Sequence, residues 1–137
     1  MEALLELQRE VGGAGLAAPQ AGYAIRVAVS DPLVLINPEI IDRSEETMTL
    51  REGCISIPGF HGFIERSRRV RVRARDVDGG WREFDAEDGL AVIVQHELDH
   101  LDGVLYPDLL PEGEELRRSE APRTRRRLSV WRRARSK

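Results

Sequence analysis

The segment His96-Glu97-Leu98-Asp99-His100 has the residue types and spacing with the clearest chemistry in this chain. Histidines four positions apart project from one face of a helix, about one turn apart, so both imidazoles can reach a single metal ion. Glu97 follows the first histidine directly, where its carboxylate can exchange a proton with a water bound to that metal. The pattern predicts a hydrolytic metal centre; the alternative is a solvated helix face with two ordinary histidines.

A catalytic metal site usually has three protein ligands and one open position, and this segment supplies only two. Candidates for the third ligand are Cys54, His61 and several carboxylates. Cys54 follows a glycine that would let the backbone approach the metal, and a thiolate is a strong ligand, but a lone cysteine is more often a small buried apolar residue. His61 lies in a Gly-Phe-His-Gly stretch typical of a surface loop. Spacing alone leaves the choice open.

The histidines must be positioned by a helix, and residues 86–103 are the one long helical candidate. Apolar residues recur there at helical spacing, namely at Leu90, Ile93, Val94, Leu98 and Leu101. Asp85 or Asp88 can cap the start of the helix, and Gly103 can close its end.

Shorter elements surround this helix in the sequence. Residues 2–10 predict a helix that ends at Gly12-Gly13, and alternation predicts strands at 25–29, 33–36, 48–57, 69–75 and 81–84. Asn37-Pro38 is expected to end the second strand, Pro58-Gly59 the third, and residues 78–80 to turn between the last two. Short antiparallel strands around a central helix predict an α+β domain.

Three segments appear together in a fixed order: Gly13-Ala14-Gly15-Leu16-Ala17-Ala18-Pro19-Gln20, Glu52-Gly53-Cys54-Ile55-Ser56 and Gln95-His96-Glu97-Leu98-Asp99-His100. Together they resemble the three signature motifs of the peptide deformylases. The resemblance extends over about residues 4–110 and implies a deformylase-like α+β fold with the histidine helix at its centre.

The resemblance also implies a reaction, the hydrolysis of the N-formyl group from the initiator methionine of a nascent peptide, with release of formate. It implies one ferrous ion per chain, replaceable by zinc, nickel or cobalt, with the ligands Cys54, His96 and His100. Glu97 is then the acid/base, and the Gln20 amide and the Ile55 backbone N–H are the oxyanion donors. The substrate-binding residues carried over from the family are Ala14, Gly15, Gly53, Val92, Ile93 and Arg66.

The sequence departs from the family pattern in three places. Family members usually begin further upstream, with a strand and an arginine-rich turn, so the chain reads as an N-terminally short, phage-type member. Ala14 stands where a branched residue is common, which removes apolar contact with the substrate. Ile55 replaces a leucine, but the oxyanion donor there is a backbone group. We therefore expect catalysis to be retained.

Charge divides the chain unevenly. Residues 117–137 contain ten Lys/Arg and one acid, which leaves −12 on the other 116 residues of a chain whose net charge is −3. We expect a catalytic domain over 1–110 and a basic tail over 111–137, with the charges of 117–137 meeting ribosomal RNA phosphates or simply being solvated. A single cysteine, no signal peptide and no apolar run predict a cytoplasmic protein without membrane contact.

Two other functions remain open. A zinc peptidase of the HExxH type usually takes its third ligand downstream of the helix, yet no histidine follows His100. A catalytically weakened deformylase-like protein, kept as a ribosome- or RNA-binding module, would fit the short N-terminus and the basic tail but not the complete set of site residues.

Overall fold

The structure, a computed structural model, describes residues 1–119 of the chain. Its helices and strands follow in the order α1 (Glu2–Val11), β1 (Leu16–Ala17), η1 (Ala18–Ala21), β2 (Val27–Ser30), β3 (Leu33–Arg43), β4 (Thr47–Cys54), β5 (Ile57–Ser67), β6 (Arg69–Arg75), β7 (Trp81–Glu87), α2 (Asp88–Leu101), η2 (Tyr106–Leu109) and β8 (Arg117–Arg118). This mixture confirms the predicted α+β class. No helix in the described part is long and apolar enough to cross a membrane.

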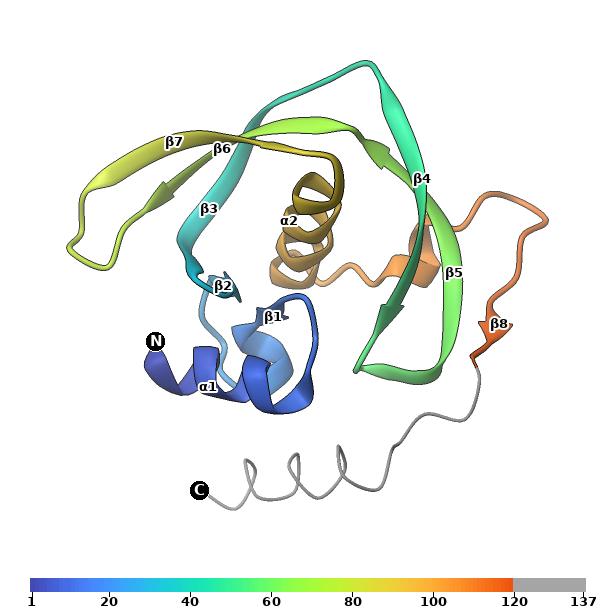
Figure 1. Cartoon of the computed structure of the whole chain (residues 1–137), viewed down its shortest axis with the longest axis horizontal. Coiled ribbons are helices and arrows are strands. Elements are labelled where there is room, and N and C mark those ends of the chain that lie inside the picture. Colours follow the sequence, from blue (N-terminus) through green and yellow to red (C-terminus); the bar gives the residue numbers. More distant parts are fainter. Residues whose placement is uncertain (120–137) are drawn as a thin grey trace.

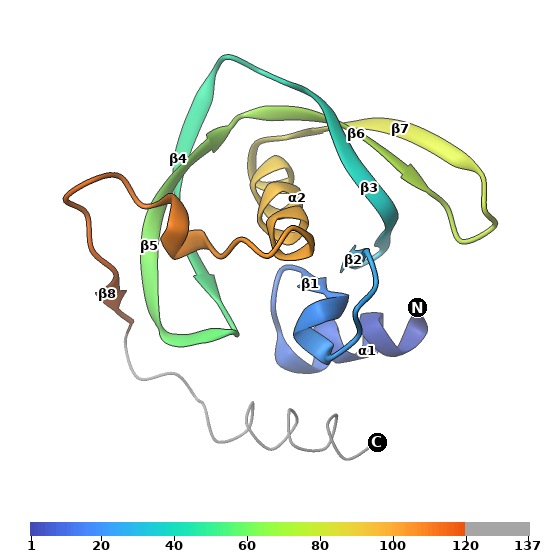
Figure 2. The ribbon, with the colours of Figure 1, turned by 180° about the vertical axis from the view of Figure 1, so that it is seen from behind.

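The strands form two antiparallel sheets that surround α2. The larger sheet has the order β1-β2-β3-β6-β7, and the smaller one has the order β4-β5-β8. Figure 1 shows α2 in the middle of the molecule, with β3 on one side and β4 and β5 on the other. Seen from behind, η2 and β8 lie along the β4–β5 pair (Figure 2). The predicted central position of the histidine helix is confirmed.

One apolar cluster fastens α2 to the larger sheet. The alternation predicted for 69–75 holds in β6, where Val70, Val72 and Ala74 are fully buried and the arginines between them reach solvent. These side chains pack against Ala91, Val94 and Leu98 of α2. Burial of such a surface is the main favourable term in folding, and here it fixes the helix that carries the histidines.

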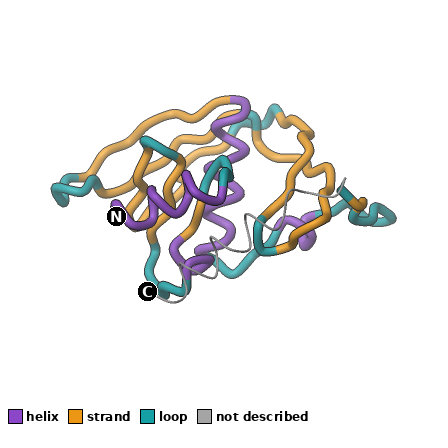
Figure 3. The backbone as a smooth tube through the Cα atoms, turned by 60° about the horizontal axis from the view of Figure 1, so that its bottom comes forward, coloured by secondary structure: helices purple, strands orange, loops and turns teal. Residues whose placement is uncertain are grey.

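A second cluster joins α1 to the short strands β1 and β2. Leu4, Leu7 and Val11 of the helix are buried against Leu16 and Val29. The predicted end of α1 is confirmed at Gly12, whose φ of 70° is the left-handed conformation that glycine adopts without strain. The tube in Figure 3 shows the two helices among the strands. The chain then leads from α1 through Gly13–Gly15 into the site.

Two predicted strand ends are wrong. β3 continues through Asn37-Pro38 to Arg43, because a register shift between Ile36 and Glu39 accommodates the proline, and Asn37 takes a φ of 48°. Pro58 and Gly59 lie inside β5 rather than after a strand, near a second register shift between Glu52 and Cys54. A bulge leaves residues unpaired, so it tolerates a proline that cannot donate a backbone hydrogen bond.

The predicted capping of α2 is also wrong. Glu87 is the N-cap residue and makes no side-chain cap hydrogen bond. Asp85 belongs to β7, which stays paired with β6 up to Glu87. Asp88 has a φ of 54°, and its N–H donates to the Arg68 carbonyl at 2.9 Å. A paired strand therefore runs directly into the helix, which leaves no loop residue to cap it.

Candidate active site

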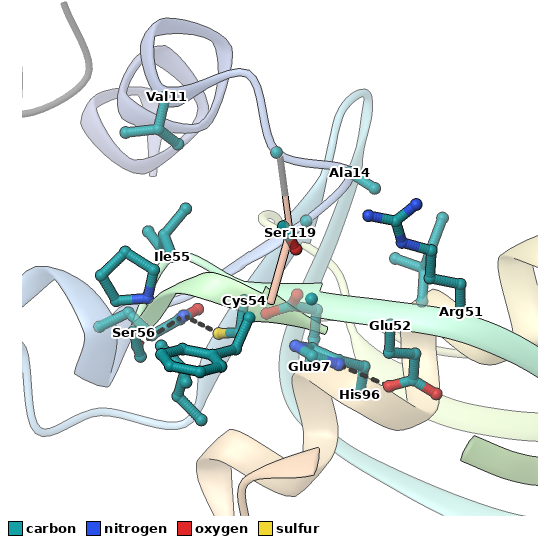
Figure 4. A pocket seen from close by; sticks show the side chains of 18 of the residues that line it. Val11, Ala14, Arg51, Glu52, Cys54, Ile55, Ser56, His96, Glu97 and Ser119 are labelled. Carbon is teal, nitrogen blue, oxygen red and sulfur yellow. Dashed lines mark hydrogen bonds and ion pairs between the residues drawn. The ribbon is translucent and has the colours of Figure 1, made fainter. Parts of the chain in front are cut away.

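Segments far apart in the sequence converge beside α2 on a cavity of about 890 Å³. Helix α2 contributes His96 and Glu97, the end of β4 contributes Cys54, and η1 contributes Gln20. Figure 4 shows Cys54, His96 and Glu97 close together, with Ile55 and Ser56 beyond the sulfur. All these residues except Ser56 were predicted to form one site, and the fold brings them to one cavity.

Cys54, His96 and His100 form a triad whose ligand atoms all lie within 4.8 Å of one another. The Cys54 Sγ is 3.4 Å from the His100 Nε2, which is 3.1 Å from the His96 Nε2. Tetrahedral bonds of ordinary length to zinc would separate two nitrogens by about 3.3 Å and a sulfur from a nitrogen by about 3.6 Å. The spacing and the donor atoms therefore fit one divalent metal ion.

A carboxylate orients the first histidine. The Nδ1 of His96 lies 2.8 Å from the Glu52 Oε1, and since a carboxylate accepts, this nitrogen carries the proton and the Nε2 is left to bind a metal. Glu52 is held in turn by Arg66, whose Nε and Nη2 donate to its two oxygens at 2.6 and 2.9 Å. Arg66 also donates to the Asp99 Oδ2 at 2.7 Å. We name Glu52, Arg66 and Asp99 the support network.

The triad perturbs the ionisation of its own members. Burial raises the pKa of the Cys54 thiol, but hydrogen bonds with His100 and His96 outweigh this and lower the pKa to about 5. Burial lowers the pKa of His96, and its hydrogen bonds with Cys54 and Glu52 raise it to about 9. A lowered pKa favours the thiolate, which is the form in which cysteine binds metals.

Glu97 lies in the wall of the cavity and, among the described residues, one of its carboxylate oxygens is free to accept a hydrogen bond. Its side chain is buried, and its Oε2 has no hydrogen-bond partner among residues 1–119. Burial raises the pKa of Glu97 to about 7, against the lowering effect of His96 and His100. A carboxyl group with a pKa near neutrality is suited to take up and return a proton. Gly15 makes room for this side chain, since a Cβ there would lie 2.9 Å from the Glu97 Cγ and Oε1.

The amide of Gln20 is fixed with its nitrogen towards the triad. The backbone N–H of Ala17 donates to the Gln20 Oε1 at 2.9 Å, which assigns the other amide position to the NH₂ group. That nitrogen donates to the Cys54 Sγ and to the Ser56 Oγ, at 3.2 Å each. A donor held beside the triad is placed to stabilise negative charge that develops there.

Most of the predicted substrate-binding residues line the cavity: Ala14, Gly15, Gly53, Val92 and Ile93. Arg66 does not, because it is buried in the support network beneath the site, 6% exposed. Glu52 and Asp99 were not predicted from the sequence as functional residues. Each is an acid within two residues of a predicted ligand, a signal that would have directed attention to them.

The comparisons with known proteins agree with this geometry. The family model described as polypeptide deformylase matches residues 1–115. The chain belongs to the peptide deformylase family. A peptide deformylase of Alkalilimnicola ehrlichii is 51% identical over 117 residues, and one of Dictyoglomus thermophilum is 45% identical over 109 residues. These matches cover 80% and 77% of this chain but 65% and 71% of the relatives, so the chain spans about two-thirds of their length.

Solved structures of peptide deformylases have the same fold. A class I type b enzyme from Acinetobacter baumannii superposes with a TM-score of 0.76 at 38% identity, covering 78% of this chain and 76% of the other. The enzyme from Synechococcus elongatus, solved in complex with actinonin, has the same TM-score and identity and covers 80% and 63%. The one from Thermotoga maritima has a TM-score of 0.72 at 39% identity, covering 77% and 79%. The predicted family and fold are therefore confirmed.

Proposed function

We propose that this chain hydrolyses the N-formyl group of peptides that begin with formyl-methionine and releases formate. The observation that carries the proposal is the combination at one site of the triad, the Glu97 carboxylate with its unpartnered oxygen, and the fixed Gln20 amide. Membership of the peptide deformylase family supports the same reaction.

Cys54, His96 and His100 would hold one divalent ion, which we propose to be ferrous iron, with zinc, nickel or cobalt as substitutes. When bound, such an ion supplies a Lewis acid that polarises the formyl carbonyl and makes a water more acidic. An HExxH peptidase would take its third ligand downstream of the helix, whereas the third member of this triad is Cys54, upstream. The triad therefore does not support that alternative.

The chain's own groups account for the remaining steps. Glu97 takes a proton from the attacking water and gives it to the nitrogen of the leaving amine. The Gln20 NH₂ group and the Ile55 backbone N–H donate hydrogen bonds to the carbonyl oxygen as it gains charge. Because Gly15 has no Cβ, there is room beside it for the Glu97 carboxylate to serve in both transfers.

The walls of the cavity suit an extended peptide. Gly13–Gly15 on one side and Gly53 on the other present backbone without large side chains, so a substrate can lie between them as an added strand. Val92 and Ile93 of α2 provide an apolar surface for the methionine side chain, which adapts to irregular surroundings.

A formate assay tests the proposal. Iron-loaded protein, kept anaerobic, should release formate from formyl-Met-Ala, and Glu97→Ala should lower kcat by about 10²- to 10⁴-fold because the proton carrier is lost. Metal content is the control, since Glu97 is not in the triad and the variant should still bind one ion per chain. Metal-loaded wild-type protein that releases no formate would refute the proposal.

We also propose that the basic residues 117–137 bind ribosomal RNA, and that the protein acts in the cytoplasm, where formylated nascent chains arise. The support is their charge of +9 in the sequence; residues 120–137 lie outside the described part of the chain. Deleting 120–137 should abolish salt-sensitive binding to ribosomes and leave hydrolysis of formyl-Met-Ala intact. Ribosome binding that persists in the truncated protein contradicts this role.

A further inference from the structure

The outer rim of the cavity carries a positive charge without a partner. Arg51 lines the cavity from β4 and forms no ion pair within residues 1–119. The two acidic residues that line the cavity do not pair with Arg51. Glu52 is held by Arg66 and His96, and Glu97 lies against Gly15. In Figure 4 the side chain of Arg51 extends towards Ala14.

His61 anchors this arginine without neutralising it. The Nη2 of Arg51 lies 3.4 Å from the His61 Nδ1, and the Ser119 Oγ lies 2.9 Å from the same nitrogen. A guanidinium can only donate, so the Nδ1 of His61 accepts and the imidazole is uncharged. Burial and, after it, the charges of Arg51 and Arg117 lower the pKa of His61, which also favours the uncharged imidazole. The rim therefore keeps the full charge of Arg51.

A second guanidinium, that of Arg117, lies near His61. Strand β8 pairs Arg117 with His61, and the guanidinium of Arg117 lies 5.4 Å from the centre of the Phe63 ring. Phe63 is the register partner of Arg51 across the β4–β5 pair. Arg117 likewise forms no ion pair within the described residues. Arg117 does not line the cavity itself, but its charge acts on the same imidazole as that of Arg51, so two segments far apart in the sequence bring positive charge close to His61.

The distance from the triad sets which part of a substrate meets this charge. A formyl group held at Cys54 leaves the peptide to run outward between Gly15–Gly13 and the end of β4. Arg51 precedes Cys54 by three residues, which is about 10 Å along a strand. With the methionine as position 1, the side chains at positions 2 and 3 come within reach of Arg51.

We propose that this rim selects formyl-methionyl peptides with an acidic side chain at position 2 or 3. The inference rests on the proposed function and adds a preference that the triad itself does not provide. Opposite charges at a partly solvated rim attract one another over a few ångströms, and the attraction weakens as salt is added.

The test compares kcat/KM for formyl-Met-Ala-Xaa-Ala and formyl-Met-Xaa-Ala-Ala, where Xaa is Asp, Asn or Lys. The peptides end in an amide, so the only added carboxylate is the Asp side chain; one formyl-Met-Ala-Ala-Ala with a free terminus reports on that second source. We expect Asp to be favoured over Lys by roughly three- to tenfold at low salt, and by less at high salt. R51Q should bring the ratio close to one, and R117Q should reduce it partly.

R69Q is the matched control, because Arg69 is an exposed arginine on β6 outside the cavity lining, and the ratio should not change. A wild-type protein that releases formate from the Asn peptides but treats Asp and Lys alike, or keeps its preference in R51Q, overturns the rim inference and leaves the proposed function standing. Absence of formate from every peptide overturns both.

Discussion

Two of the regions in which arginine pairs with carboxylates differ in what the pairing does. In the support network beneath the triad, the side chains of Arg66 and Glu52 are both 4% exposed and 2.6 Å apart. On the outer face of β6 and β7, Arg71 lies 3.2 Å from both Glu83 and Asp85, with all three side chains between 42% and 51% exposed. The residue types are the same, and the difference is access to water.

Water decides what each pair contributes. An exposed arginine that loses its partner is solvated instead, so the outer pairs add little to stability and position nothing else. A buried carboxylate that loses its partner keeps a charge that water cannot reach. Because Glu52 also accepts from His96, the buried pair orients a member of the triad as well as balancing charge. Distance alone would rank the two regions as similar.

The largest effect is expected for Arg66→Met. The substitution leaves Glu52 and Asp99 without their cation, and breaking a buried pair from one side costs about 3–5 kcal/mol of unfolding free energy. Urea denaturation measures the loss, and metal titration should show weaker binding because His96 is less well held. Adding Glu52→Gln to Arg66→Met removes the stranded charge and should restore part of the stability. An Arg66→Met protein as stable as wild type would erase the contrast between the two regions.

A smaller effect, confined to catalysis, is expected for Gly15→Ala. Its Cβ would lie 2.9 Å from the Cγ and Oε1 of Glu97, so the carboxylate must shift. A misplacement of about an ångström can lower activity by roughly 10²-fold, and kcat/KM for formyl-Met-Ala measures it. Metal content should stay the same. Gly89→Ala is the control, because nothing lies within 4 Å of a Cβ at Gly89. Equal losses in both variants would show that the Glu97 contact is irrelevant.

The smallest effect is expected for Arg71→Met, the counterpart of Arg66→Met on the outer face. Glu83 and Asp85 remain solvated after the substitution, so the urea midpoint should barely move and formate release should be unchanged. Measuring both arginine variants in one buffer makes the comparison direct. A loss of stability as large as that of Arg66→Met would show that exposure does not separate these pairs.

The sequence by itself determined the chemical elements of the site. A spacing of four on a helix places His96 and His100 on one face in any fold, and the alternation in 69–75 predicted the buried face of β6. The three ordered motifs added Gln20, and they selected Cys54 as the third predicted ligand, a choice that spacing alone had left open between Cys54, His61 and several carboxylates. These features are local or depend on short patterns, so they can be recognised before the chain is folded.

Only the tertiary structure decided how these groups are held. It placed His61 beside Ser119 and Arg51 instead of in the triad, and it placed Arg66, a predicted substrate-binding residue, in a buried pair with Glu52. It also carried β3 and β5 through prolines that were expected to end strands. Each of these outcomes depends on burial and pairing between segments far apart in the chain. A local pattern of residues does not determine which distant side chains will pack together and exclude water.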